Sequence, residues 1–90
     1  MKEEKDATAA VIHHPEDRRF AGVNGGLLTY EIDEDGRFIV LHTEVPERLR
    51  GQGIAAQLAE AALSFAERSN YVAMSRCEYV AAYMTRRKKR

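Results

Sequence analysis

The spacing of hydrophobic positions changes from the period of strands to the period of helices near the middle of the chain. In the first half, short apolar runs bounded by turn residues predict four strands, Thr8 to His13, Arg18 to Val23, Leu27 to Ile32 and Arg37 to Val45. Asn24-Gly25-Gly26 and Asp33-Glu34-Asp35-Gly36 are typical of the turns that join neighbouring antiparallel strands. We therefore expect a four-stranded antiparallel meander.

The second half predicts a helix, a strand and a helix. The first helix runs from Gly51 or Gln52 to about Arg68, with apolar residues about 3.6 positions apart at Ile54, Leu58, Ala62 and Phe65. A short fifth strand, Tyr71 to Ser75, and a second helix, Cys77 to about Arg87, follow. Because the fifth strand comes after a helix, it should pair in parallel with the fourth through a right-handed crossover. The fold class is thus α/β with a mixed sheet.

The fourth strand is apolar on both of its expected faces. Strict alternation places Phe38, Val40, His42 and Glu44 on one face, and Ile39, Leu41, Thr43 and Val45 on the other. We therefore expect this strand to be central and covered on both sides.

Composition limits the chain to one domain, residues 1–90, with 1–7 and 88–90 expected to be disordered. Hydrophobic residues make up 44% and charged residues 31%, as in ordinary soluble domains, and no apolar run is long enough to span a membrane. The single cysteine excludes an internal disulfide and fits a reducing, cytoplasmic setting.

Five basic residues, Arg86 to Arg90, end the chain, and without them nine basic residues face 14 acidic ones. The simplest interpretation is a solvated terminus. Contact with phosphates or with an acidic partner is the alternative. The patch is too small to indicate nucleic-acid binding.

The segment Arg50-Gly51-Gln52-Gly53-Ile54-Ala55 lies between the fourth strand and the long helix. A helix N-terminus leaves backbone N–H groups without partners and favours an anion. Glycines without a Cβ let the backbone approach an oxyanion closely and take positive φ. This segment therefore predicts a phosphate cradle, with Arg50 adding a positive charge.

These residues resemble the GNAT acetyltransferase superfamily. Arg50-x-x-Gly53-x-Ala55 fits its Arg/Gln-x-x-Gly-x-Gly/Ala signature, and the flanking His42-Thr43-Glu44-Val45 and Cys77 occur in order in its minimal single-domain members. The resemblance implies that acetyl-coenzyme A binds here, with its pantetheine arm between splayed fourth and fifth strands. The cofactor-binding residues would be Val45, Arg50, Gly51, Gln52, Gly53, Ile54 and Ala55.

Cys77 stands at the start of the last helix. The minimal GNAT-like proteins that this chain resembles, called look-alikes below, carry a candidate catalytic cysteine at this place. A helix N-terminus and the adjacent Arg76 would lower the pKa of its thiol. The alternative is a small buried hydrophobic residue. The look-alikes usually carry a proline before this cysteine, whereas this chain has Ser75-Arg76.

Three further side chains are catalytic candidates. The histidine pKa suits His42 to act as a general base, and Glu44 projects from the same face of the strand. Tyr83 matches the helix on which many GNAT enzymes carry a tyrosine that protonates the departing thiolate, although Tyr79 lies one turn earlier on the same face. Each could instead be a packing or solvated residue.

Acyl transfer from acetyl-coenzyme A to an amine is the function we expect, on a small molecule, a peptide or a protein lysine. Direct attack and a route through acetyl-Cys77 both remain open. The alternatives are a non-catalytic module that binds coenzyme A or a protein partner, and a nucleotide-phosphate binder. His13 and His14 alternate in direction and have no nearby cysteine, so no metal site is expected.

Overall fold

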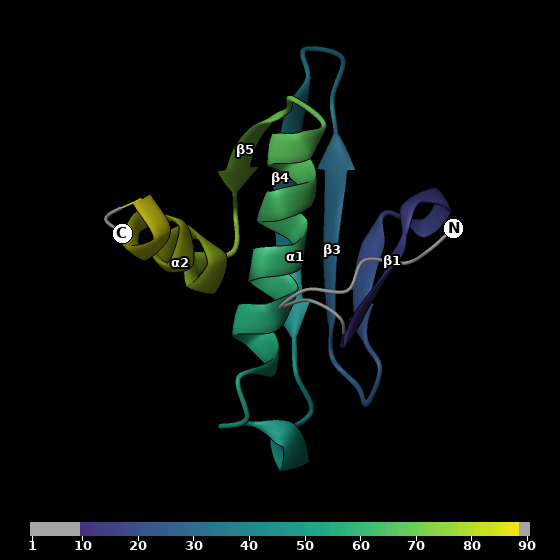
Figure 1. Cartoon of the computed structure of the whole chain (residues 1–90), viewed down its shortest axis with the longest axis vertical. Coiled ribbons are helices and arrows are strands. Elements are labelled where there is room, and N and C mark those ends of the chain that lie inside the picture. The colour runs from purple at the N-terminus through teal and green to yellow at the C-terminus, as the bar shows by residue number, and fades with distance from the viewer. Residues whose placement is uncertain (1–9, 89–90) are drawn as a thin grey trace.

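The computed structural model describes residues 10–88. In chain order its elements are β1 (Val11–His14), the 3-10 turn η1 (Pro15–Asp17), β2 (Arg19–Gly22), β3 (Leu27–Ile32), β4 (Arg37–Glu44), the 3-10 turn η2 (Glu47–Leu49), α1 (Ile54–Arg68), β5 (Val72–Ser75) and α2 (Glu78–Lys88). The strands form one sheet in the order β1-β2-β3-β4-β5. Figure 1 shows α1 lying along this sheet and α2 beyond β5.

The topology confirms the predicted fold class. Each neighbouring pair from β1 to β4 is antiparallel, whereas β4 and β5 run parallel on either side of the α1 crossover. A helix is needed here because parallel neighbours cannot be joined by a tight turn.

The element bounds differ from the predictions mainly at the ends. Thr8 and the predicted disordered residues 1–7 and 89–90 lie outside the described part of the chain, so the structure describes β1 from Val11. The helix α1 begins at Ile54, since Gly53 has a φ of 79° and cannot be its first helical residue. Lys88 belongs to α2, so the prediction that disorder begins at this residue was wrong.

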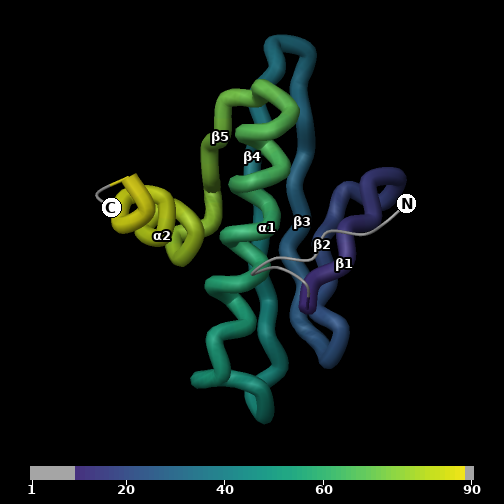
Figure 2. The backbone as a smooth tube through the Cα atoms, viewed as in Figure 1, coloured from purple at the N-terminus to yellow at the C-terminus, as the bar shows by residue number. Residues whose placement is uncertain are grey.

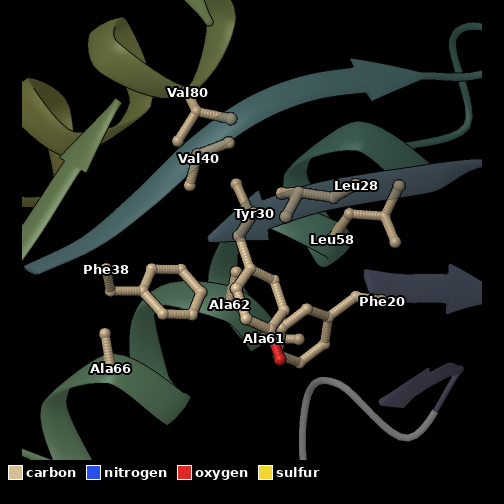
Figure 3. Packing of buried hydrophobic residues seen from close by; sticks show 11 residues of the cluster. Phe20, Leu28, Tyr30, Phe38, Val40, Leu58, Ala61, Ala62, Ala66 and Val80 are labelled. Atoms are coloured by element: carbon tan, nitrogen blue, oxygen red, sulfur yellow. The ribbon is translucent and has the colours of Figure 1, made fainter. Parts of the chain in front are cut away.

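The hydrophobic core lies between one face of the sheet and the helices (Figure 3). Phe38 and Val40 of β4 meet Leu58 of α1 and Val80 of α2, all with no exposed surface. Alanines give α1 its close approach to the sheet, with Ala59, Ala62 and Ala66 also fully buried. The predicted apolar stripe is therefore confirmed, although Ile54 and Phe65 are only partly buried.

The opposite face of the sheet is open among residues 10–88. Its apolar side chains include Ile12, Val72 and Met74, which are 49%, 62% and 45% exposed. Ile39 of β4, which lies on this face, is only half-buried. The expectation that β4 would be covered on both sides was therefore wrong for the described part of the molecule. We call this surface the open face.

A β-bulge changes the direction of side chains within β4. Thr29 of β3 pairs with His42, but the next residue, Tyr30, pairs with Val40, so Leu41 is an extra residue. Beyond the bulge, Thr43 pairs with the buried Leu28 and points toward the helices. His42 and Glu44 consequently lie on the open face. The prediction that they share a face with Phe38 and Val40 was wrong, because strict alternation fails at a bulge.

Candidate functional site

The predicted phosphate cradle is an open loop at the start of α1. Gly51 and Gly53 both have positive φ, 83° and 79°, and a Cβ at either position would meet no other atom within 4 Å. Gly53 is the N-cap, and no side chain caps this end. The first helical bond runs from the Gln57 N–H to the Gly53 carbonyl, 3.0 Å away. The N–H groups of the first helical turn are thus left for an external anion.

A cavity of about 230 Å³ opens beside this loop. It brings together six of the seven residues expected to hold the cofactor, together with three others: Val45, Leu49, Arg50, Gly51, Gly53, Ile54, Ala55, Ala56 and Tyr79. Gln52, the remaining predicted residue, is not part of the lining. Tyr79, which comes from α2, also lines the cavity.

The fourth strand continues beyond the end of its parallel neighbour. The pairing of β4 with β5 stops at Val40 and Ser75, and the Arg76 N–H then donates to the Val40 carbonyl at 2.8 Å. Figure 2 shows the backbone leaving β5 partway along β4 and turning away into α2. The last part of β4 therefore has no fifth-strand partner among the described residues. Backbone groups on such an edge can bond an extended ligand.

Cys77 stands at this edge, directly before α2. Its thiol is half-buried and lies 3.6 Å from the Thr43 hydroxyl of β4. Burial alone would raise the pKa of the Cys77 thiol, but hydrogen bonds from the backbone amides of Val80, Tyr79 and Thr43, and from the Thr43 hydroxyl, outweigh it and lower this pKa. The thiolate is therefore easier to form than in an ordinary cysteine.

Ser75 fixes the backbone around that thiol. Its hydroxyl donates to the Cys77 carbonyl at 2.8 Å and accepts from the Cys77 N–H at 3.0 Å. In this chain a serine with two local hydrogen bonds thus orders the approach to α2, close to where the look-alikes carry a proline.

His42 and Glu44 form a neighbouring pair on the open face. Their Nε2 and Oε1 atoms lie 3.7 Å apart, and their side chains are 64% and 68% exposed. The pair is suited to accept a proton on the face of β4 that points away from α1.

Tyr83 and Tyr79 occupy different places. The Tyr83 hydroxyl donates to Glu60 Oε1 on α1 at 2.7 Å, whereas Tyr79 lines the cavity. The two rings stack with their centroids 6.4 Å apart. Tyr79 therefore lies at the cavity, whereas Tyr83 is hydrogen-bonded to α1.

The basic C-terminal end is partly built into the fold. Arg87 bonds both oxygens of Glu60, at 2.9 and 3.1 Å, and also Glu67. The interpretation of this end as a solvated terminus was therefore wrong for Arg87. Arg86 lies over the Tyr83 ring, 5.8 Å from its centroid.

Several contributors to the site carried no sequence signal of their own. Thr43 was assigned to the wrong face because the bulge was not foreseen, and Glu60 looks like any polar residue of an amphipathic helix. From the sequence, Tyr79 is only an alternative to Tyr83 on the same face of the helix. The spacing of the two tyrosines does not say which of them faces the cavity.

The part of the chain that the structure describes contains no helix long and apolar enough to cross a membrane. In the same residues, no three potential histidine, cysteine or carboxylate ligands gather as they would around a metal ion.

Three features occur together in this mixed sheet, as expected for a GNAT-like fold: a glycine loop at an uncapped helix, a fourth strand that continues past its parallel neighbour, and a thiol beside the unpaired end. A sequence profile of the GCN5-related N-acetyl-transferase family matches residues 17–90. The chain belongs to this family.

Among known proteins, the chain is similar to Protein NATD1 of several vertebrates. It is 35% identical to the mouse protein over 86 residues, which cover 90% of this chain and 78% of the mouse protein. It is 38% identical to the Xenopus tropicalis protein over 58 residues, covering 64% of this chain and 53% of that protein. The match to human Protein NATD1 is 46% over 43 residues, covering 48% and 38% of the two chains.

Proposed function

We propose that this protein transfers an acetyl group from acetyl-coenzyme A to an amine. Membership of the GCN5-related N-acetyltransferase family supports an acetyltransferase role. The observation that carries the proposal furthest is the cavity between the glycine loop and α2, which continues toward the unpaired end of β4.

The donor's pyrophosphate fits the loop. The free N–H groups at the start of α1 and the Arg50 guanidinium would bond its oxygens. Val45, directly after the unpaired end of β4, would offer backbone groups to the pantetheine arm. Bound acetyl-coenzyme A supplies the activated acyl group, and the chain's residues orient it and move protons.

Two routes for transfer remain. In direct transfer, His42 with Glu44 takes the proton of the attacking ammonium, so the neutral amine forms the C–N bond as the C–S bond breaks. In the second route the Cys77 thiolate attacks the thioester carbonyl, coenzyme A leaves as its thiolate, and the amine then attacks acetyl-Cys77. In direct transfer, the candidates to protonate the leaving thiolate are Cys77, Tyr79 and Tyr83. In the second route only the two tyrosines are candidates, because Cys77 is the nucleophile, and attack by the neutral amine then releases the Cys77 thiolate. The acceptor can be a small amine, a peptide amine or a protein lysine.

Titration with coenzyme A, followed by amide chemical shifts, tests the binding step. The amides of Gly51, Gly53 and Ala55 should shift. Gly53→Asp should abolish binding, because its carboxylate would occupy the phosphate site. Undiminished affinity in that variant would place the donor elsewhere.

Consumption of acetyl-coenzyme A with a panel of amines tests the chemistry. Turnover that depends on the amine supports acetyl transfer. Tight binding of coenzyme A with no turnover on small amines, peptides or proteins would instead identify a non-catalytic binding module.

A further inference from the structure

Hydrophobic packing alone holds α2 weakly. Val80 is its buried residue and packs in the same core as Val40, while Tyr83 and Met84 are only partly buried. Val80 is therefore the single fully buried anchor of α2, and the partly buried side chains pack at the edge of the core. A second, polar contact between α1 and α2 adds to this packing in holding the direction of the helix.

That second contact is a polar cluster between the helices, which we call the Glu60 clamp: Glu60, Tyr83 and Arg87. Arg87 meets Glu60 through two parallel bonds, from Nε to Oε1 at 2.9 Å and from Nη2 to Oε2 at 3.1 Å. Tyr83 adds a bond of 2.7 Å to the same carboxylate. The paired side chains are only 21% and 28% exposed, so water screens this fork less than a surface ion pair.

The hydrogen bonds of the clamp shift the pKa values of both charged partners. The bonds from Arg87, aided by Tyr83 and Ser64 and opposed by partial burial, lower the pKa of Glu60 to about 2, and the pKa of Arg87 is raised by the same partners. Both groups therefore stay charged at neutral pH.

Two chains of contacts lead from the clamp to the candidate site. The Tyr83 ring stacks on Tyr79, which lines the cavity. The Cys77 carbonyl accepts from the Ala81 N–H at 2.9 Å, so Cys77 moves with α2 while its thiol contacts Thr43 of β4. A change in the direction of α2 would displace both the cavity wall and the thiol.

We propose that Glu60 and Arg87 are positioning residues, whose clamp sets Cys77 against Thr43 and Tyr79 against the cofactor cavity. Their importance for acetyl transfer rests on the proposed function. Their effect on the thiol does not, and it can be measured without any acyl donor.

The test is the pH profile of Cys77 alkylation by iodoacetamide, since only the thiolate reacts. In Glu60→Ala, loss of the bonds from Thr43 should slow alkylation at pH 7 about threefold, equivalent to a half-unit rise in the thiol pKa. Glu60→Gln keeps an acceptor for Tyr83 and should give a smaller effect. Glu67→Gln is the matched control. Glu67 is on the same helix and bonds Arg87, whereas the Tyr83 hydroxyl bonds Glu60, so the profile should stay at the wild-type position.

An alkylation profile in folded Glu60→Ala that coincides with wild type would overturn the proposal and leave the clamp a purely structural contact. Should that variant unfold, Arg87→Lys, which keeps the charge but loses the fork, decides in the same way. A shifted profile in a protein that binds no coenzyme A would keep the positioning role and reject the proposed function.

Discussion

Gly53 combines two requirements at a single residue. Its positive φ starts α1, and its missing Cβ leaves the cradle open. Gly53→Ala should cost about 1–2 kcal/mol of stability from left-handed strain and should also weaken coenzyme A binding.

Gly36 provides a matched control. It has a φ of 80° with the same open surroundings, but lies in the turn between β3 and β4. Gly36→Ala should lower the melting temperature to a similar degree and leave the dissociation constant unchanged. Equal affinities in the two variants would show that Gly53 serves the backbone alone.

Arg50 should contribute to affinity through its charge. A charge-assisted contact to a pyrophosphate is worth about 1.5–3 kcal/mol, so Arg50→Ala should weaken coenzyme A binding about tenfold or more at low salt. Arg48→Ala removes a nearby exposed charge that does not line the cavity and should have little effect. Calorimetric titration of both variants separates a local contact from general attraction.

Cys77 distinguishes the two routes. If its thiolate is the nucleophile, Cys77→Ser should retain coenzyme A binding and lose almost all transfer, and the wild-type protein without acceptor should gain one acetyl group in its mass spectrum. Alkylation should be faster than for an ordinary thiol and blocked by acetyl-coenzyme A. Sustained turnover in Cys77→Ser would leave direct transfer as the route.

At the scale of elements, the sequence was sufficient where the signal is local. The predicted range of β3 matches the structure to the residue. The helix α1 and the strands before and after it, β4 and β5, were predicted from the spacing of hydrophobic residues and from the turn residues. The bulge at Leu41 could not be read in this way, because an extra residue in an apolar run changes no composition and no turn signal. The bulge reverses the predicted direction of His42, Thr43 and Glu44, and Val45 likewise packs on the core side.

The clamp was also invisible to sequence reasoning. Glu60 and Arg87 are 27 residues apart, and their meeting depends on how α2 packs after the crossover. Tertiary packing, which no local pattern encodes, also decides which of the two tyrosines lines the cavity.

For the whole molecule, acid should reduce stability in two stages. Burial, helped by His14 and Arg68 and opposed by Glu16, lowers the pKa of His13 below 6.5, so the stability it contributes is present above pH 6.5 and is lost as pH falls toward the lowered value. The pKa of Glu60 falls from 4.5 to about 2, so its contribution is lost between those two values. Melting temperatures across this pH range should show both declines.

Glu60→Gln should reduce the second decline, to which Asp33 and Glu67 also contribute through their lowered pKa values, and should leave the first unchanged. Its melting temperature should lie below that of wild type near pH 7, and the difference should shrink below about pH 3. A wild-type-like acid profile would show that other carboxylates govern acid unfolding.

The bulge in β4 finally has a kinetic consequence. It directs His42 and Glu44 to the open face, while the glycine loop and its cavity belong to the helix side. Acetyl-coenzyme A would then reach the site from the helix side of the sheet and the amine from the open face, so neither substrate would block the other. If transfer is direct, a dead-end donor analogue such as desulfo-coenzyme A should raise the KM for acetyl-coenzyme A and leave the KM for the amine unchanged. Competition between this analogue and the amine would mean that both substrates enter the site from the same face of the sheet.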